Sequence, residues 1–177
     1  MGTLTAVPPW HAQYETLYRQ HWARVVRLCR LLLDDSEEAL EVAQEVFLRL
    51  AQRFQAPDST TEWGAWLTRV SLNACHARRR SGWWRRGRAG AGAAGEIDLV
   101  DGEPTPERAA LQGEARERIW RALHRLPLRQ REVFVLRHLE GWSTEAAGAA
   151  LSLSSGSVKR HLFRAVRRLR RALGGDS

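Results

Sequence analysis

Apolar residues recur at spacings near three, four and seven along most of the chain, which places them on one face of a helix. The first such stretch predicts a helix over about residues 13–33. A second predicted helix begins at the break formed by residues 34–36 and ends before Pro57. A third begins near Thr60 or Thr61, either of which can cap it, and its apolar side is rich in tryptophan. The alternating pattern typical of strands is scarce.

After the third helix the periodicity disappears. The run GRAGAGAAG at 87–95 does not hold a helix well, and two prolines follow it. Helical periodicity returns in four stretches, at about 107–126, 129–139, 143–151 and 154–173. The sequence therefore predicts an all-α protein with two small helical domains, residues 13–81 and 107–173, joined by a flexible linker over 82–106.

The last two predicted helices have the size and order of a helix-turn-helix. Ser143 can cap the first of them and Ser154 the second, because a serine hydroxyl accepts a free backbone N–H of the first turn. From residue 159 to 171 there are seven Lys or Arg residues and no acid. A basic second helix suits the major groove of DNA, which is about as wide as a helix. The alternative is an ordinary helical hairpin with a solvated basic face.

The distribution of charge points in the same direction. The chain carries a net charge of +8, yet residues 1–81 hold ten Arg against nine acids, and residues 82–112 hold four Arg against five. Residues 113–177 hold fourteen Lys or Arg against six acids, so the surplus lies at the C-terminal end. Basic residues gain affinity for DNA by releasing the counterions of its phosphates. A solvated basic helix would carry the same charge, so charge alone leaves both interpretations open.

The second predicted helix has an acidic face. Glu37, Glu41 and Glu45 are spaced by four and so lie on one side. Like charges at this spacing cost some helix stability, which favours a basic partner, although a solvated face fits the spacing equally well. Paired carboxylates can also serve an enzyme, but such a site needs a nucleophile or a metal-ligand set, and the six His residues share no motif. We expect no enzymatic activity.

The third predicted helix ends in a basic and aromatic segment. Residues 78–86 read RRRSGWWRR, and basic residues interleaved with Trp83 and Trp84 suit unpaired DNA, where rings stack on bases. The same composition could lie on an anionic membrane surface. A third possibility is that the two tryptophans bind another protein or close the helical core.

Few other chemistries fit the sequence. Cys29 and Cys75 are the only cysteines, and their spacing is not that of metal ligands, so we expect two buried free thiols, no metal and no cofactor. No apolar run approaches the ~20 residues needed to cross a bilayer, and the start of the chain does not read as a signal segment. The expectation is a cytoplasmic protein without membrane insertion.

Four segments, taken in order, resemble the sigma-70 family, specifically its compact two-domain group of extracytoplasmic function (ECF) sigma factors. Segments 43–49 (AQEVFLR) and 65–73 (AWLTRVSLN) resemble the family's second region. Segment 126–134 (LPLRQREVF) resembles the opening of the fourth region, and residues 143–162 resemble its helix-turn-helix. The resemblance covers nearly all of both predicted domains.

The resemblance implies a bacterial transcription initiation factor that binds core RNA polymerase, recognises the −10 and −35 elements of promoter DNA, and answers to an anti-sigma factor. The residues expected to bind core polymerase are Glu38, Glu41, Gln44 and Glu45. Those expected at the unpaired −10 element are Arg69, Asn73, His76 and Arg80. Those expected at the −35 element are Ser157, Lys159, Arg160, His161, Phe163 and Arg164.

This chain departs from the family's pattern in three places. Ser152 stands where the family usually has Gly in the turn, so a residue other than glycine must take that conformation. Ala147 and Gly148 replace a bulkier apolar residue and an Ala, which predicts a weaker first helix of the pair. Residues 55–61 lack the family's usual aromatic, basic and Gly residues. The alternative function is a stand-alone helix-turn-helix regulator that binds palindromic duplex DNA as a dimer.

Overall fold

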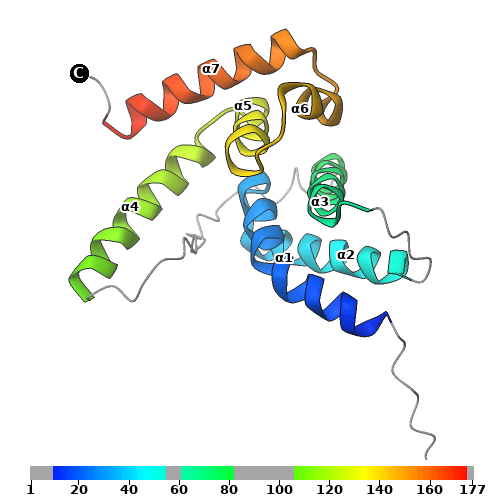
Figure 1. The fold of residues 1–177 in the computed structure, drawn as a ribbon. Coiled ribbons are helices and arrows are strands. Elements are labelled where there is room, and N and C mark those ends of the chain that lie inside the picture. The colour runs from blue at the N-terminus through cyan, green and yellow to red at the C-terminus, as the bar shows by residue number, and fades with distance from the viewer. Residues whose placement is uncertain (1–9, 55–60, 82–105, 175–177) are drawn as a thin grey trace, which may run out of the picture.

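The computed structural model describes residues 10–54, 61–81 and 106–174, and within these ranges every regular element is a helix (Figure 1). The all-α fold expected from the sequence is therefore confirmed. Most of the predicted linker, with Trp83 and Trp84, lies outside the described residues, and its last residue, Pro106, already begins a helix. In chain order the elements are α1 (His11–Leu32), α2 (Ser36–Phe54), α3 (Trp63–Arg80), α4 (Pro106–His124), α5 (Leu128–Phe134), η1 (Val135–Leu139), α6 (Thr144–Leu151) and α7 (Ser155–Ala172).

Helices α1, α2 and α3 pack against one another around a shared apolar core. The predicted break between α1 and α2 is present, and Asp35 caps α2: its Oδ1 accepts the backbone N–H groups of Glu37 and Glu38, each at 2.9 Å. The expected threonine cap of α3 is wrong at Thr61, because Glu62 occupies the cap position without a side-chain hydrogen bond. Cys29 and Cys75 are buried free thiols, as expected.

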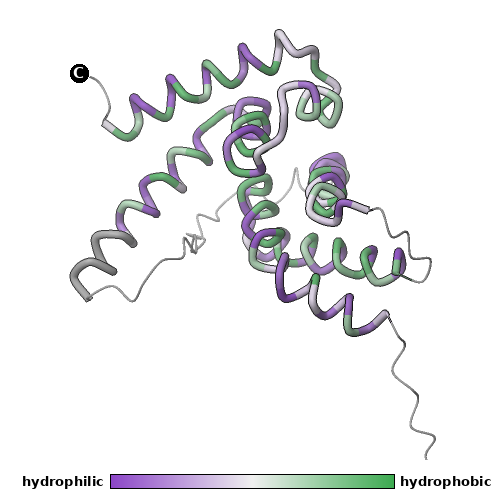
Figure 2. The backbone as a smooth tube through the Cα atoms, in the orientation of Figure 1, coloured by the Kyte–Doolittle hydropathy of each residue, from purple (hydrophilic) through white to green (hydrophobic). Residues whose placement is uncertain are grey.

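The later helices form a second group, in which α5 and α6 pack against α7. The predicted single helix over 129–139 is instead α5 followed by the π-helical turn η1, and Gly141, at φ 69°, ends it. Apolar and polar residues alternate along α7 at helical spacing (Figure 2), so one side of the helix can be buried while the other faces water. The exact domain boundaries, 13–81 and 107–173, remain predictions.

The turn between α6 and α7 depends on local hydrogen bonds. Ser143 Oγ accepts the backbone N–H of Ala146 at 3.0 Å, and Ser154 Oγ accepts that of Ser157 at 3.2 Å, so both predicted caps are confirmed. Ser152 takes the left-handed conformation that its place in the turn requires, at φ 55° and ψ 46°. The starts of α6 and α7 are therefore both capped, and the left-handed turn lies between the two helices.

The low helix propensity of Gly148 predicted a weaker α6, but the structure shows that this glycine has a role in packing. A Cβ at this position would lie 2.7 Å from the carbonyl oxygen of Leu153, closer than such atoms approach. The backbone N–H of Leu153 also donates to the carbonyl of Gly148 at 2.8 Å. The absence of a Cβ at Gly148 therefore permits α6 to lie close to the turn. This packing offsets the helix stability that is lost through the low helix propensity of glycine.

We predict that Gly148→Ala lowers the free energy of unfolding by about 1–3 kcal/mol, the usual cost of overpacking a tight site. Gly156→Ala is the matched control, because a Cβ there meets nothing within 4 Å. On helix propensity it should be neutral or stabilise by up to about 1 kcal/mol. Urea unfolding of both variants gives the comparison, and equal effects would contradict the steric role of Gly148.

Candidate nucleic-acid interface

The outward face of α7 presents the residues expected at the −35 element. Lys159, Arg160 and Arg164 are exposed, and Phe163 is 68 % exposed, unusual for a large apolar side chain. Val158, Ala165 and Leu169, at helical spacing from one another, are buried on the opposite side. The remaining two expected residues, Ser157 and His161, are half-buried.

The cap of α7 also orients one arginine. Arg160 Nη2 donates to Ser157 Oγ at 3.1 Å, and Ser157 Oγ accepts from the Ser154 hydroxyl at 3.0 Å. The cap, the half-buried Ser157 and the exposed guanidinium therefore form one chain of hydrogen bonds. Ser157 positions Arg160 at the start of the helix, where recognition helices contact base edges.

The edge of α3 expected at the −10 element lies partly against the second group of helices. Arg69, Asn73 and Arg80 are exposed, and His76 is half-buried. The Arg69 guanidinium carbon lies 5.9 Å from the centre of the Trp142 ring, within cation–π range. His76 Nε2 lies 2.8 Å from Glu132 Oε1.

The exposed side of α2 is both acidic and apolar. Glu41 and Gln44 are exposed, and Glu45 is half-buried. Glu38, the fourth residue expected to bind polymerase, is only 7 % exposed, and this burial raises the pKa of its carboxyl group. Leu48 is 64 % exposed beside them, and sequence reasoning missed it because its helical spacing does not distinguish it from a core residue.

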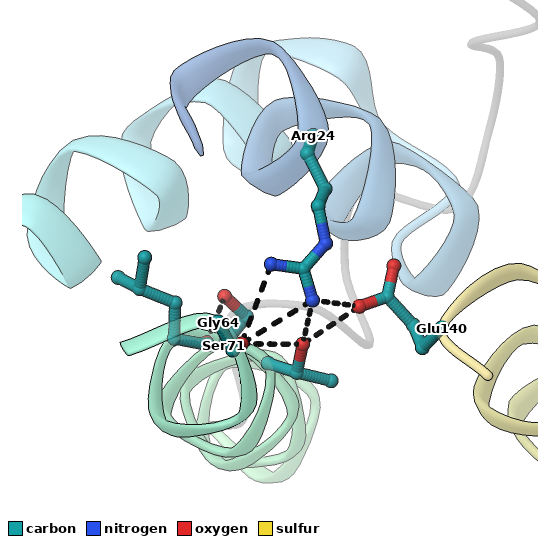
Figure 3. A network of polar contacts seen from close by, with 6 residues as sticks. Arg24, Gly64, Ser71 and Glu140 are labelled. Atoms are coloured by element: carbon teal, nitrogen blue, oxygen red, sulfur yellow. Dashed lines mark hydrogen bonds and ion pairs between the residues drawn. The ribbon is translucent and has the colours of Figure 1, made fainter. Parts of the chain in front are cut away.

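Polar side chains join the two groups of helices, and we call this set the polar seam. Glu140 Oε2 pairs with the Arg24 guanidinium and accepts the Thr68 hydroxyl at 2.7 Å (Figure 3). Glu132 lies between His76 and Arg79 of α3 and Arg129 of its own helix. Asp34 contacts His124 at 3.1 Å and Arg131 at 2.8 Å. The seam thus consists of Arg24, Asp34, Thr68, His76, Arg79, His124, Arg129, Arg131, Glu132 and Glu140.

The electrostatics of the seam depend on its depth. The side chains of Glu140 and Glu132 are 2 % and 1 % exposed, so each carboxylate relies on the partners around it rather than on water. At the more open end, the hydrogen bond with His124 and then the charge and hydrogen bond of Arg131 hold the pKa of Asp34 well below its usual range. No pattern in the sequence predicted these pairs.

A groove of about 430 Å³ lies between α4, α5 and α7. Apart from Arg170 and Gly174 its lining residues are apolar, and they include Ile119, Phe134 and Val166. The groove is therefore mainly apolar, unlike the outer face of α7, which is basic. Sequence reasoning missed it, because its walls come from three helices that are distant in the chain.

None of the helices in the described ranges combines the length and the apolar character needed to cross a membrane. No three His, Cys, Asp or Glu side chains in those ranges are grouped so that they could hold a metal ion.

Comparison with known proteins gives matches over both groups of helices. Residues 17–85 match the family model described as Sigma-70 region 2, and residues 116–169 match Sigma-70, region 4. The chain is 33 % identical over 165 residues to the RNA polymerase sigma-E factor of Streptomyces coelicolor, which covers 91 % of this chain and 86 % of that protein. It is 32 % identical over 161 residues to the ECF RNA polymerase sigma factor SigM of Mycobacterium tuberculosis, covering 91 % and 77 %.

Solved structures share the fold. The sigma factor RpoE of Bartonella quintana, crystallised with the anti-sigma factor NepR, matches with a TM-score of 0.68 at 18 % identity, covering 93 % of this chain and 99 % of that one. CnrH, in complex with the cytosolic domain of CnrY, matches with a TM-score of 0.60 at 23 % identity, covering 94 % and 91 %. With two family regions in order and relatives matched over most of their length, this chain belongs to the sigma-70 family, in its ECF group of RNA polymerase sigma factors.

Proposed function

We propose that this sigma factor uses three separate helical faces to start transcription: α7 for the −35 element, α3 for the −10 element, and α2 for core RNA polymerase. The observation that carries this proposal is the basic outer face of α7, presented by a helix-turn-helix with a serine cap on each helix. The protein acts by binding rather than by catalysing a reaction of its own, and its place of action is the bacterial cytoplasm.

At the −35 element, α7 enters the major groove with its N-terminal half. Arg160 and Arg164 are exposed and suit the acceptor atoms of guanine or the phosphates. Phe163 offers an apolar contact for a thymine methyl group, which accounts for an exposed aromatic ring between two arginines. Lys159, Ser157 and His161 complete the face.

At the −10 element, the edge of α3 meets unpaired bases. Asn73 can donate and accept hydrogen bonds at an exposed base edge, and Arg69 and Arg80 supply charge for the phosphates. His76 lies between them on the same edge. Of the four, only His76 is half-buried, because it lies against Glu132.

Core polymerase binds the exposed side of α2. Its acids, Glu41 and Glu45, suit a basic surface, and Leu48 supplies the apolar contact that a stable protein interface needs. Glu38 is buried, so it would support the packing of α2 rather than contact polymerase directly. An anti-sigma factor is a further partner, since the sigma factor RpoE, which shares this fold, was crystallised with the anti-sigma factor NepR.

Co-elution of the purified protein with bacterial core RNA polymerase on a sizing column tests the proposal. A stoichiometric complex is the expected result. Failure to form it, together with a dimer that binds duplex DNA unaided, would favour the stand-alone regulator instead. That alternative gives the acidic face of α2 no role. Replacing Glu41 and Glu45 by Gln should then leave the protein's affinity for duplex DNA unchanged.

Arg160→Ala should weaken initiation from a −35-dependent promoter by about five- to 150-fold, the effect of losing one base-directed arginine at about 1–3 kcal/mol. Polymerase binding should be unchanged. Arg171→Ala is the matched control, since it removes the same charge from an exposed position in the last turn of α7. In vitro transcription measures both, and an equal loss in the two variants would contradict a specific contact by Arg160.

Asn73→Ala should impair promoter opening more than polymerase binding, because its amide is placed to meet bases that are exposed only after the strands separate. Permanganate footprinting of the opened region, alongside a polymerase-binding titration, separates the two steps. Gln52→Ala removes an exposed amide from α2 and serves as the control. Parallel loss of both steps in Asn73→Ala would argue against a role confined to the unpaired strand.

A further inference from the structure

We propose that Ser157 is a positioning residue that orients Arg160 to read a guanine in the −35 element. This role rests on the function proposed for α7. It adds the base that one arginine recognises and the residue that sets this preference. The chain of hydrogen bonds from Ser154 through Ser157 to Arg160 carries the assignment.

Arg160 differs from the other Lys and Arg side chains expected at the −35 element, because the protein holds it in place. Its Nη2 donates to Ser157 Oγ at 3.1 Å, about one helical turn earlier. Lys159 and Arg164 are also exposed, but neither has a hydrogen bond or ion pair to any residue that the structure describes. A side chain that is ordered before binding loses less rotamer freedom when it meets its target. Arg160 therefore suits a directional contact with a base, whereas the two free side chains suit phosphates.

The directions of these hydrogen bonds give Ser157 and Arg160 a single polarity. A guanidinium only donates, so Ser157 Oγ is the acceptor of the bond from Arg160. The Ser154 hydroxyl donates to the same oxygen at 3.0 Å. Both acceptor lone pairs of Ser157 Oγ are then in use, and this hydroxyl can offer only its proton. The pair therefore presents hydrogen-bond donors and no free acceptor.

A surface that only donates fits guanine better than the other bases. In the major groove guanine presents two acceptors, N7 and O6, whereas adenine presents the N7 acceptor beside an N6 amino donor. Arg160 uses one N–H on Ser157 and keeps the others, which are enough for a bidentate contact with N7 and O6. The N6 amino group of adenine would meet a second donor instead. We therefore expect Arg160 to select guanine over adenine at one position.

The positioning role of Ser157 can be separated from the capping of α7. The cap is Ser154 Oγ, which accepts the backbone N–H of Ser157 at 3.2 Å. Ser157→Ala keeps this N–H and removes only the oxygen that holds Arg160. Ser157→Thr keeps a hydroxyl at the same place. Ser155→Ala is the matched control, because it removes the hydroxyl of an exposed serine from the same turn.

The test uses the full chain bound to core RNA polymerase and a promoter library randomised over the −35 element. Sequencing the bound DNA gives the base preference at each position. The unsubstituted protein should prefer guanine over adenine by about five- to 150-fold at one position, and Arg160→Ala should abolish that preference. Ser157→Ala should weaken the same preference by about two- to tenfold, because the guanidinium is no longer oriented. Ser157→Thr should restore it, and Ser155→Ala should leave it unchanged.

Two further readouts separate positioning from a general loss of binding. In the Arg160→Ala background, Ser157→Ala should cause no further change at that position, because Ser157 acts through Arg160. The dependence of promoter binding on salt concentration should be unchanged in Ser157→Ala, since no phosphate contact is lost. Thermal unfolding followed by circular dichroism checks that Ser157→Ala keeps the stability of the unsubstituted protein.

Three outcomes would overturn the assignment: Arg160→Ala altering the preference for a base other than guanine, Ser157→Ala behaving like Ser155→Ala, or the losses adding in the double variant. If the chain does not bind core polymerase, the proposed function fails and the role of Ser157 fails with it. A normal complex that recognises promoters without a guanine preference assigned to Arg160 removes only the role proposed for Ser157 and Arg160.

Discussion

A carboxylate withdrawn from water must find cations or hydrogen-bond donors within reach, and the relative position of the two groups of helices depends on meeting that need at Glu132 and Glu140. Both side chains are almost fully buried, and each is satisfied by side chains from the other half of the chain. Removing one partner from such a buried pair typically costs about 3–5 kcal/mol. That is a large share of the stability of a small protein, whereas an exposed pair such as Arg19–Glu15 contributes at most about 1 kcal/mol.

Within each group of helices the constraint is different, because apolar faces and local caps suffice. Serine hydroxyls fix the starts of α6 and α7, and Ser152 takes the left-handed turn between them. Gly148 lets the turn pack directly on α6. The turn therefore combines a left-handed serine with a glycine that packs tightly one turn earlier. These contacts together set the position of α7 relative to α6.

How much could be predicted from the sequence follows from the range of each interaction. Helical periodicity and serine caps are local, so the all-α fold, the inward face of α7 and the caps at Ser143 and Ser154 were predictable. The seam joins residues up to 116 positions apart, such as Arg24 and Glu140, and no local pattern encodes that pairing. The burial of Glu38 and the exposure of Leu48 were not predicted, for the same reason. Helical spacing shows which residues share a face of the helix, but only tertiary packing decides whether that face is covered.

The polar seam also differs in kind from an apolar interface. Desolvation offsets most of the attraction in a buried ion pair, so such pairs add little net stability, although losing one partner of a pair is costly. An apolar interface of similar size would be harder to separate, and once separated it would expose a surface prone to aggregation. Charged side chains, in contrast, are readily hydrated when they are exposed. The polar seam therefore joins the two groups of helices through side chains that either group can also present to water.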